Sequence, residues 1–222
     1  MLRSFKIKIC GITNLADAIH AVQAGADAIG LNFYERSLRS VTPMDALEIV
    51  SGLPDELVLV GVFVNQPPDE ILALAAHLQL DAIQLHGDET PEIMKLLDSR
   101  PVIRAVRVSG DTSTNIAALQ NEIDAWCTSG VSAILLDKAA GSTYGGSGET
   151  FDWKIVEQLI IPVQTILAGG LGPDNVADAI LTVVPAAVDA ASGLESFPGG
   201  KDPVLMERFV QSALVAFAKL SS

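Results

Sequence analysis

Short apolar runs alternate with segments of helical spacing along the whole chain. The runs are rich in Val, Ile, Leu and Ala, which is typical of parallel strands that are buried on both faces. We expect strands around Ile7 and over residues 28–33, 57–64, 81–85, 102–106, 133–136, 163–167 and 186–190. Eight strand-and-helix repeats without a linker or a low-complexity tract predict an α/β fold, a single-domain (β/α)₈ TIM barrel that spans residues 1–222.

Residues typical of helix ends separate these runs. Asn14 is a suitable N-cap and Gly25 a suitable stop for the first helix, and Pro203 is a suitable first residue for the last one. The last helix is expected to turn one apolar face to the sheet, made of Leu205, Met206, Phe209, Val210, Leu214 and Phe217. A doubly wound open sheet is the alternative fold, but neither GxGxxG nor GxxxxGKS follows any expected strand, so nucleotide binding has no motif to support it.

The first strand carries the most informative residue, Cys10. Alternation places Phe5, Ile7 and Ile9 on one face and Cys10 on the other, together with Lys6 and Lys8. A nearby ammonium group lowers the pKa of a thiol and favours the thiolate, which can act as a nucleophile or a base. The alternative is a small residue that fills a strand end, because free cysteines are often simply buried.

Composition excludes several functions. The formal net charge of -13 argues against a nucleic-acid or anionic-membrane partner, which requires a basic surface. Two cysteines, Cys10 and Cys127, give no disulfide framework, and neither a signal peptide nor a membrane-spanning run is visible, so we expect a cytoplasmic protein. The three histidines, His20, His77 and His86, are scattered and no metal-ligand spacing occurs, so we expect no metal site.

Polar residues gather where the expected strands end, and a TIM barrel carries its catalytic groups at that end. These residues are Cys10, Asn32, Asn65, His86, Asp137 and Asp189. Strand parity turns Asn32, Asp137 and Asp189 toward the barrel interior, because their neighbours in sequence are apolar. The alternative for each is a helix cap or a loop-closing hydrogen bond.

Glycine-rich turns follow the sixth, seventh and eighth strands. They contain Gly145, Gly146 and Gly148, then Gly169 and Gly170, then Ser192 and Gly193. In a TIM barrel a phosphate commonly lies among the loops after strands seven and eight, where backbone amides hold the anion without a positive side chain. Ordinary turn chemistry is the alternative explanation for these glycines.

Seven motifs in this order resemble the phosphoribosylanthranilate isomerase family from one end of the chain to the other. They are KICGIT at 8–13, GLNF at 30–33 with Ser37 and Arg39, GVFVN at 61–65, QLHGDE at 84–89, LLD at 135–137 with GGSG at 145–148 and FDW at 151–153, AGGL at 168–171, and SGLE at 192–195 with PG at 198–199 and KD at 201–202. The resemblance implies an isomerase of tryptophan biosynthesis without a cofactor or metal. Its substrate would be a small phosphorylated aminosugar, N-(5-phosphoribosyl)anthranilate, which an Amadori rearrangement converts to the 1-deoxyribulose 5-phosphate derivative.

Carried over by position, the resemblance makes Cys10 the general base, Asp137 the general acid and Arg39 a contact for the anthranilate carboxylate. The further expected substrate-binding residues are His86, Asp189, Gly146, Gly169, Gly170, Ser192 and Gly193. Ala190, Ala191 and Leu194 depart from the family pattern, which puts one hydrogen bond of the phosphate loop in doubt. We expect a monomer.

The same chemistry can be argued from the residues alone. Opening a furanosylamine needs an acid at the ring oxygen, and moving the double bond needs a base at the neighbouring carbon. We further expect Lys8 to pair with Asp189 across the first and eighth strands, and the alternative is that Asp189 contacts the ribose. Two other functions stay open, a Schiff-base aldolase that uses Lys8 or Lys138 and a barrel that binds a phosphate ligand without turnover.

Overall fold

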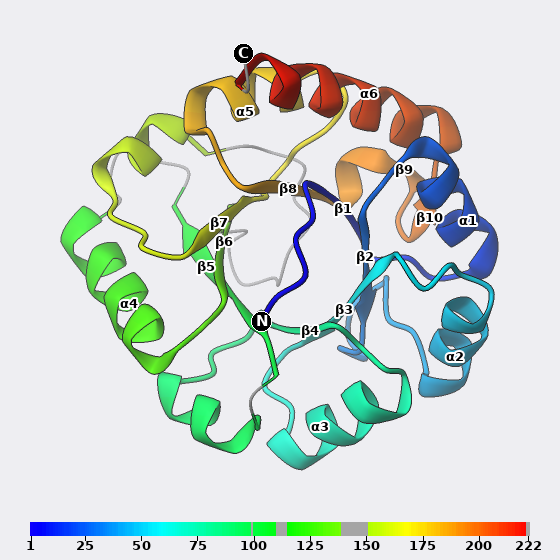
Figure 1. The fold of residues 1–222 in the computed structure, drawn as a ribbon, viewed down its shortest axis with the longest axis horizontal. Coiled ribbons are helices and arrows are strands. Elements are labelled where there is room, and N and C mark those ends of the chain that lie inside the picture. The colour runs from blue at the N-terminus through cyan, green and yellow to red at the C-terminus, as the bar shows by residue number, and fades with distance from the viewer. Residues whose placement is uncertain (99, 110–114, 139–150, 221–222) are drawn as a thin grey trace.

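A computed structural model describes residues 1–98, 100–109, 115–138 and 151–220. Its eight parallel strands form a closed barrel in sequence order, and β1 pairs with β8 to complete the ring (Figure 1). The strands are β1 (Ile7–Cys10), β2 (Ala28–Asn32), β3 (Val58–Phe63), β4 (Ala82–Leu85), β5 (Val102–Val108), β6 (Ala133–Lys138), β7 (Gln164–Leu167) and β8 (Ala187–Ala190). The (β/α)₈ barrel predicted from the apolar runs is therefore confirmed, and the open sheet is excluded.

Helices surround this barrel and cover the outer faces of its strands (Figure 1). The α-helices are α1 (Leu15–Ala24), α2 (Pro43–Ser51), α3 (Pro68–His77), α4 (Ile116–Ser129), α5 (Val176–Val183) and α6 (Pro203–Leu220). The crossovers after β4 and β6 instead contain the 3₁₀ helices η1 (Pro91–Leu96) and η2 (Trp153–Gln158), so the helical pattern expected there is only partly correct. Throughout the described ranges, every helix is too short or too polar to cross a lipid bilayer.

The predicted helix ends are confirmed. The side chain of Asn14 accepts a hydrogen bond from the amide of Asp17 at 2.9 Å, and Gly25 ends α1 with a φ of 98°, a conformation that glycine adopts without strain. In α6 the expected apolar face is buried at Met206, Phe209, Val210 and Phe217. Leu205 is partly buried, and Leu214 is 43% exposed.

Two apolar layers follow from the alternation along the strands. Small and branched side chains such as Val60, Ala105 and Leu135 fill the barrel interior, while residues such as Ile9, Leu31 and Leu136 pack between the strands and the helices. The inward-facing positions alternate with the helix-facing ones along each strand, and near the carboxyl ends of the strands the inward-facing residues are polar. The fold thus places polar side chains at the carboxyl end of the barrel interior.

The alternation predicted for the first strand is correct only from Ile7 onward. Phe5 precedes β1 and packs into the barrel interior with Leu2, away from the helix-facing layer. Lys6 lies outside the barrel, where its ammonium group sits 5.4 Å from the centre of the Phe217 ring. The thiol of Cys10 therefore shares its face with one lysine, Lys8, and not with two.

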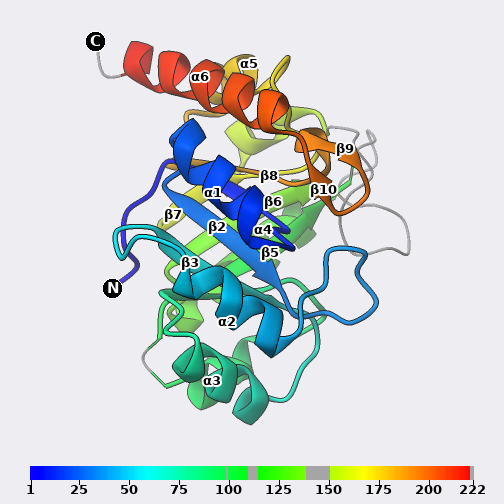
Figure 2. The same cartoon turned by 90° about the vertical axis from the view of Figure 1, so that its right-hand side faces the viewer.

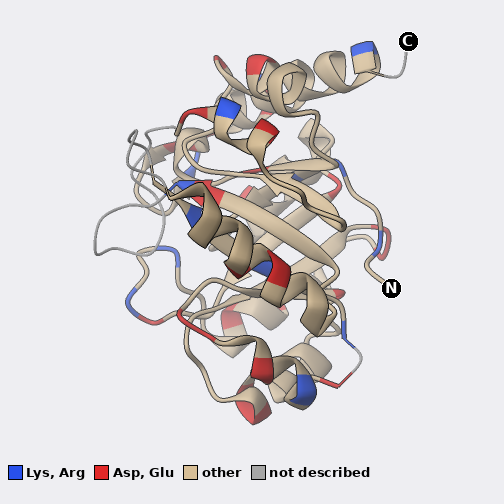
Figure 3. Cartoon of the chain, turned by 90° about the vertical axis from the view of Figure 1, so that its left-hand side faces the viewer, with Lys and Arg blue, Asp and Glu red and all other residues tan. Residues whose placement is uncertain are grey.

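Beyond β8 the chain adds η3 (Ser192–Leu194) and a small antiparallel hairpin of β9 (Glu195–Phe197) and β10 (Gly200–Lys201). Figure 2 shows this hairpin on the side of the barrel opposite the N-terminus. This side is where the parallel strands end, and the sequence predicted the chemistry there. Figure 3 shows acidic segments spread over helices and loops with basic segments among them.

Candidate active site

A pocket opens at the carboxyl ends of the strands. Its lining includes Cys10, Asn32, Tyr34, Ser37, Arg39, Gln84, His86, Asp137, Gly169, Gly170, Asp189, Ala190, Ala191 and Ser192. Eight of the expected site residues are therefore brought together. Gly193 does not line the pocket, because its α-carbon packs against the backbone of Leu171, and Gly146 lies outside the described residues.

Asp137 reaches the pocket from β6 and is held by a chain of polar side chains. Its Oδ2 lies 3.1 Å from Nε2 of His86, and Nδ1 of His86 lies 3.1 Å from the amide nitrogen of Gln84. An amide nitrogen can only donate, so Nδ1 accepts in this arrangement and the ring proton of a neutral His86 faces Asp137. Asp137 is only 9% exposed, so its carboxyl group lies at the boundary between the core and the pocket.

Cys10 ends β1 with its thiol in the same pocket, and Lys8 lies beside it. A Cβ placed on Gly30 would lie 2.6 Å from Sγ of Cys10 and 3.1 Å from Nζ of Lys8, which shows how closely the two groups adjoin. Burial raises the pKa of the Cys10 thiol, and the Lys8 charge opposes this without overcoming it. The expectation of a lowered pKa is therefore wrong, because burial of the thiol raises its pKa more than the Lys8 charge lowers it.

Lys8 is fully buried inside the barrel and pairs directly with Asp189. Nζ of Lys8 lies 3.0 Å from Oδ1 of Asp189, as predicted from the pairing of β1 with β8. Burial works against the ammonium charge, but Asp189 and Cys10 outweigh it and raise the pKa of Lys8. Lys8 is therefore held as a cation and is poorly suited to the Schiff-base chemistry that was one alternative.

Arg39 lies at the edge of the pocket, but its guanidinium group is already bonded within the protein. Nε and Nη2 donate to the two carboxylate oxygens of Glu195 at 2.7 and 2.8 Å. This contact holds the pKa of Arg39 above its usual range. A second cation, Lys201, also contacts Glu195, with Nζ 2.7 Å from Oε1.

Two of the polar strand-end residues close loops. Asn32 lines the pocket, yet its side chain donates to the hydroxyl of Ser37 and accepts from the amide of Tyr34. Asn65 does not line the pocket, and its side-chain oxygen accepts from the amide of Asp88 at 2.7 Å. The loop-closing alternative therefore holds for Asn65 and partly for Asn32.

The sequence interpretation missed three residues that shape the site. Gln84 could have been found from parity, because it shares the inward face of β4 with Ala82, and His86 follows two residues later in the pocket. Glu195 and Lys201 carry no such signal, since they reach Arg39 only through a hairpin formed far away in sequence.

Comparisons with known proteins show the family of this chain. The family model for "N-(5'phosphoribosyl)anthranilate (PRA) isomerase" matches residues 7–212. The N-(5'-phosphoribosyl)anthranilate isomerase of Geobacter sulfurreducens is 45% identical over 208 residues, which cover 94% of this chain and 98% of that protein.

Solved structures give the same result. The crystal structure of phosphoribosyl anthranilate isomerase from Thermotoga maritima is 41% identical, with a TM-score of 0.82 and coverage of 95% of this chain and 99% of that one. A second isomerase structure, solved with reduced 1-(o-carboxyphenylamino)-1-deoxyribulose 5-phosphate, is 38% identical with a TM-score of 0.78 and the same coverage.

Proposed function

Because the chain belongs to the N-(5'-phosphoribosyl)anthranilate isomerase family, we propose that its pocket performs the family's rearrangement with Cys10 as general base and Asp137 as general acid. The chain is a phosphoribosylanthranilate isomerase of tryptophan biosynthesis. Its substrate would be N-(5-phosphoribosyl)anthranilate and its product 1-(2-carboxyphenylamino)-1-deoxyribulose 5-phosphate. The observation that carries this proposal is one pocket with a carboxyl group on β6 and a thiol on β1.

The reaction would begin at Asp137. A proton delivered to the furanose ring oxygen breaks its bond to C1 and leaves a protonated Schiff base between C1 and the anthranilate nitrogen. Asp137 then carries a negative charge. The N–H of His86, 3.1 Å away, would stabilise this carboxylate and keep it directed into the pocket. His86 would in this way act on the acid, beside its expected contact with substrate.

Cys10 would complete the rearrangement by removing the proton at C2. The bond electrons move into C1–C2 and neutralise the Schiff base, giving an enolamine. This becomes the aminoketone when C1 takes up a proton and the hydroxyl on C2 gives one up. Burial reduces the thiolate population, but it also makes the thiolate a stronger base once it forms. The adjacent Lys8 charge would stabilise the thiolate during this step.

The remaining pocket residues would bind the two ends of the substrate. Arg39 would hold the anthranilate carboxylate, and backbone groups of Gly169, Gly170 and Ser192 would hold the phosphate. The ligand of the second solved relative carries these same groups, a carboxyphenyl ring and a sugar phosphate. Asp189 both pairs with Lys8 and lines the pocket, so a contact with the ribose is compatible with its structural role.

Turnover of the Asp137→Asn variant tests this function. The amide keeps the shape of the acid but cannot deliver a proton, so kcat should fall by roughly a hundredfold or more. Affinity for reduced 1-(o-carboxyphenylamino)-1-deoxyribulose 5-phosphate should be largely retained. Asp69→Asn, an exposed position in the first turn of α3, is the matched control and should leave kcat unchanged. Turnover near that of the wild type in Asp137→Asn would remove Asp137 from the mechanism.

A further inference from the structure

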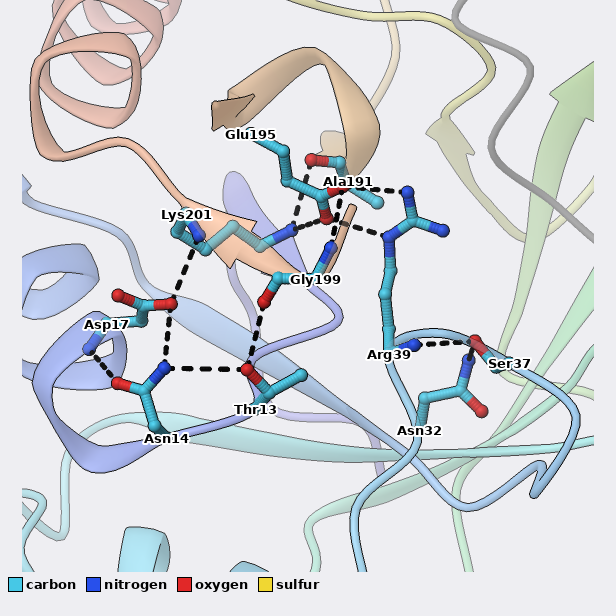
Figure 4. Close-up of polar contacts among 10 residues, drawn as sticks. All are labelled: Thr13, Asn14, Asp17, Asn32, Ser37, Arg39, Ala191, Glu195, Gly199 and Lys201. Atoms are coloured by element: carbon cyan, nitrogen blue, oxygen red, sulfur yellow. Dashed lines mark hydrogen bonds and ion pairs between the residues drawn. The ribbon is translucent and has the colours of Figure 1, made fainter. Parts of the chain in front are cut away.

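Three charged side chains, Arg39, Glu195 and Lys201, form a cluster at the edge of the pocket, and Figure 4 shows the contacts among them. Arg39 comes from the loop between β2 and α2, and Glu195 and Lys201 are register partners in the β9–β10 hairpin. Glu195 accepts from Arg39 at 2.7 and 2.8 Å and from Lys201 at 2.7 Å. Nζ of Lys201 also donates to the carbonyl of Ala191 at 3.0 Å.

Burial separates the roles of these residues. The side chains of Glu195 and Lys201 are 4% and 0% exposed and do not line the pocket, whereas Arg39 is 16% exposed and does. Glu195 and Lys201 therefore have no direct access to a ligand. Their contacts with pocket-lining residues are the bonds of Glu195 to Arg39 and the bond of Lys201 to the carbonyl of Ala191.

The hairpin that carries the two residues is attached to the start of α1. Lys201 donates its backbone N–H to Asp17 at 3.1 Å, and the hydroxyl of Thr13 donates to the carbonyl of Gly199 at 2.9 Å. The stem of Arg39 is also confined, because a Cβ on Gly11 would lie 2.5 Å from its Cδ. The guanidinium group is thus fixed at both its stem and its Nε side.

The bonds to Glu195 leave the other edge of Arg39 available for recognition. A guanidinium group has five N–H donors in a rigid plane, and Glu195 takes the pair on Nε and Nη2. The remaining Nη1 and Nη2 donors include a second parallel pair at the end of the side chain. A second carboxylate can bind that end in the same bidentate way.

Lys201 supplies the net positive charge that attracts this second carboxylate. Arg39 and Glu195 alone would form a neutral pair, and a second carboxylate would then lie near the first with no net charge to attract it. Burial lowers the pKa of Lys201, and the bond to the Glu195 carboxylate at 2.7 Å opposes this and favours the ammonium form. With the Lys201 ammonium group the cluster contains two cations and one anion, which leaves one positive charge in a site of low dielectric.

We propose that Glu195 and Lys201 are positioning residues for Arg39. Glu195 fixes the orientation of the guanidinium group, and Lys201 restores the positive charge that Glu195 cancels, so that Arg39 selects a substrate with a carboxylate on its aromatic ring. This inference rests on the proposed role of Arg39 as the carboxylate contact.

The test compares the dissociation constants of two ligands by calorimetry. One is reduced 1-(o-carboxyphenylamino)-1-deoxyribulose 5-phosphate, and the other is its phenylamino counterpart, which lacks only the carboxylate. Carboxylate selectivity is measured as the dissociation constant of the phenylamino ligand divided by that of the carboxyphenylamino ligand. A variant that only loosens the fold weakens both ligands together and leaves this ratio unchanged.

Each half of the proposal has its own variant. Lys201→Met removes the compensating charge but keeps Glu195, and it should lower the ratio by roughly tenfold, the value of one charge-assisted contact. Glu195→Asp keeps the charge but shortens the side chain, so that it no longer reaches both nitrogens, and the ratio should again fall. The double variant Lys201→Met with Glu195→Gln returns the cluster to one positive charge, and its ratio should rise above that of Lys201→Met alone.

The outcomes distinguish this inference from the function on which it rests. An unchanged ratio in Arg39→Ala would overturn the proposed carboxylate contact itself. A reduced ratio in Arg39→Ala with wild-type ratios in Lys201→Met and Glu195→Asp would leave that contact intact and overturn the positioning pair. A double variant no better than Lys201→Met would refute the charge argument. Thermal unfolding establishes that each variant is folded, and if Lys201→Met does not fold, Glu195→Asp decides the outcome.

Discussion

Gly30 offers a direct way to displace the thiol of Cys10. Gly30 pairs with Cys10 in the barrel, and alternation with Ile29 and Leu31 turns its α-carbon inward. A methyl group there would lie 2.6 Å from Sγ of Cys10 and 3.2 Å from its Cα. Ordinary van der Waals separations are about 3.5–4.0 Å, so Gly30→Ala must push the thiol aside by roughly 1 Å.

A displacement of this size has a large expected effect on the reaction. Moving a catalytic group by about 1 Å can lower the rate by roughly a hundredfold, which corresponds to about 2.7 kcal/mol in the activation free energy. The extra methyl group should also reduce the free energy of unfolding by about 1–3 kcal/mol through overpacking. We therefore expect Gly30→Ala to be folded at 25 °C with a much lower kcat and a similar KM.

Gly52→Ala is a matched control for this measurement. A methyl group on Gly52 would lie 2.6 Å from the end of the Leu15 side chain, a clash of the same size outside the pocket. The fluorescence change on turnover of the anthranilate substrate gives kcat, and denaturant unfolding gives the stability of both variants. If Gly30→Ala and Gly52→Ala retain the same kcat, the position of the Cys10 thiol does not limit the reaction and the argument fails.

Two further predictions follow from buried groups. In a Cys127→Ser background, inactivation by iodoacetamide should accelerate as pH rises. The midpoint should lie above the ordinary thiol pKa of about 8.5, because burial raises the pKa of Cys10. A midpoint below about 7.5 would contradict this. Arg104→Ala should lower the free energy of unfolding by about 3–5 kcal/mol while activity is retained. The reason is that the buried Glu89 side chain loses the guanidinium group 2.9 Å away. A loss under about 1 kcal/mol in urea unfolding would refute the claim that this buried ion pair stabilises the fold.

The barrel itself was predictable because parallel strands buried on both faces leave a strong apolar signal, repeated eight times. Parity also placed Asp137 and Asp189 correctly, and it put Lys8 opposite Asp189, which the structure confirms at 3.0 Å. Parity failed at Phe5 and Lys6, since alternation has no meaning before the strand begins at Ile7.

Other features of the site depend on contacts that no local pattern encodes. The pKa of Cys10 reflects a balance between burial and the Lys8 charge, and the degree of burial is a property of the closed barrel. Glu195 reaches Arg39 across 156 positions of sequence through a hairpin whose register brings Lys201 beside it. The monomeric state, the cytoplasmic location and the phosphate contact of Gly146 remain predictions.

The division of labour between Cys10 and Asp137 is the central claim, and an isotope effect tests it most directly. The measurement is the primary kinetic isotope effect on kcat with substrate that carries deuterium at C2 of the ribosyl group. Cys10→Ser weakens the base, so breaking the C2–H bond should limit turnover and the variant should show a full isotope effect. Asp137→Asn weakens the acid, so ring opening should limit turnover and suppress the effect. A suppressed effect in Cys10→Ser, or a full effect in Asp137→Asn, would contradict the assignment of base and acid.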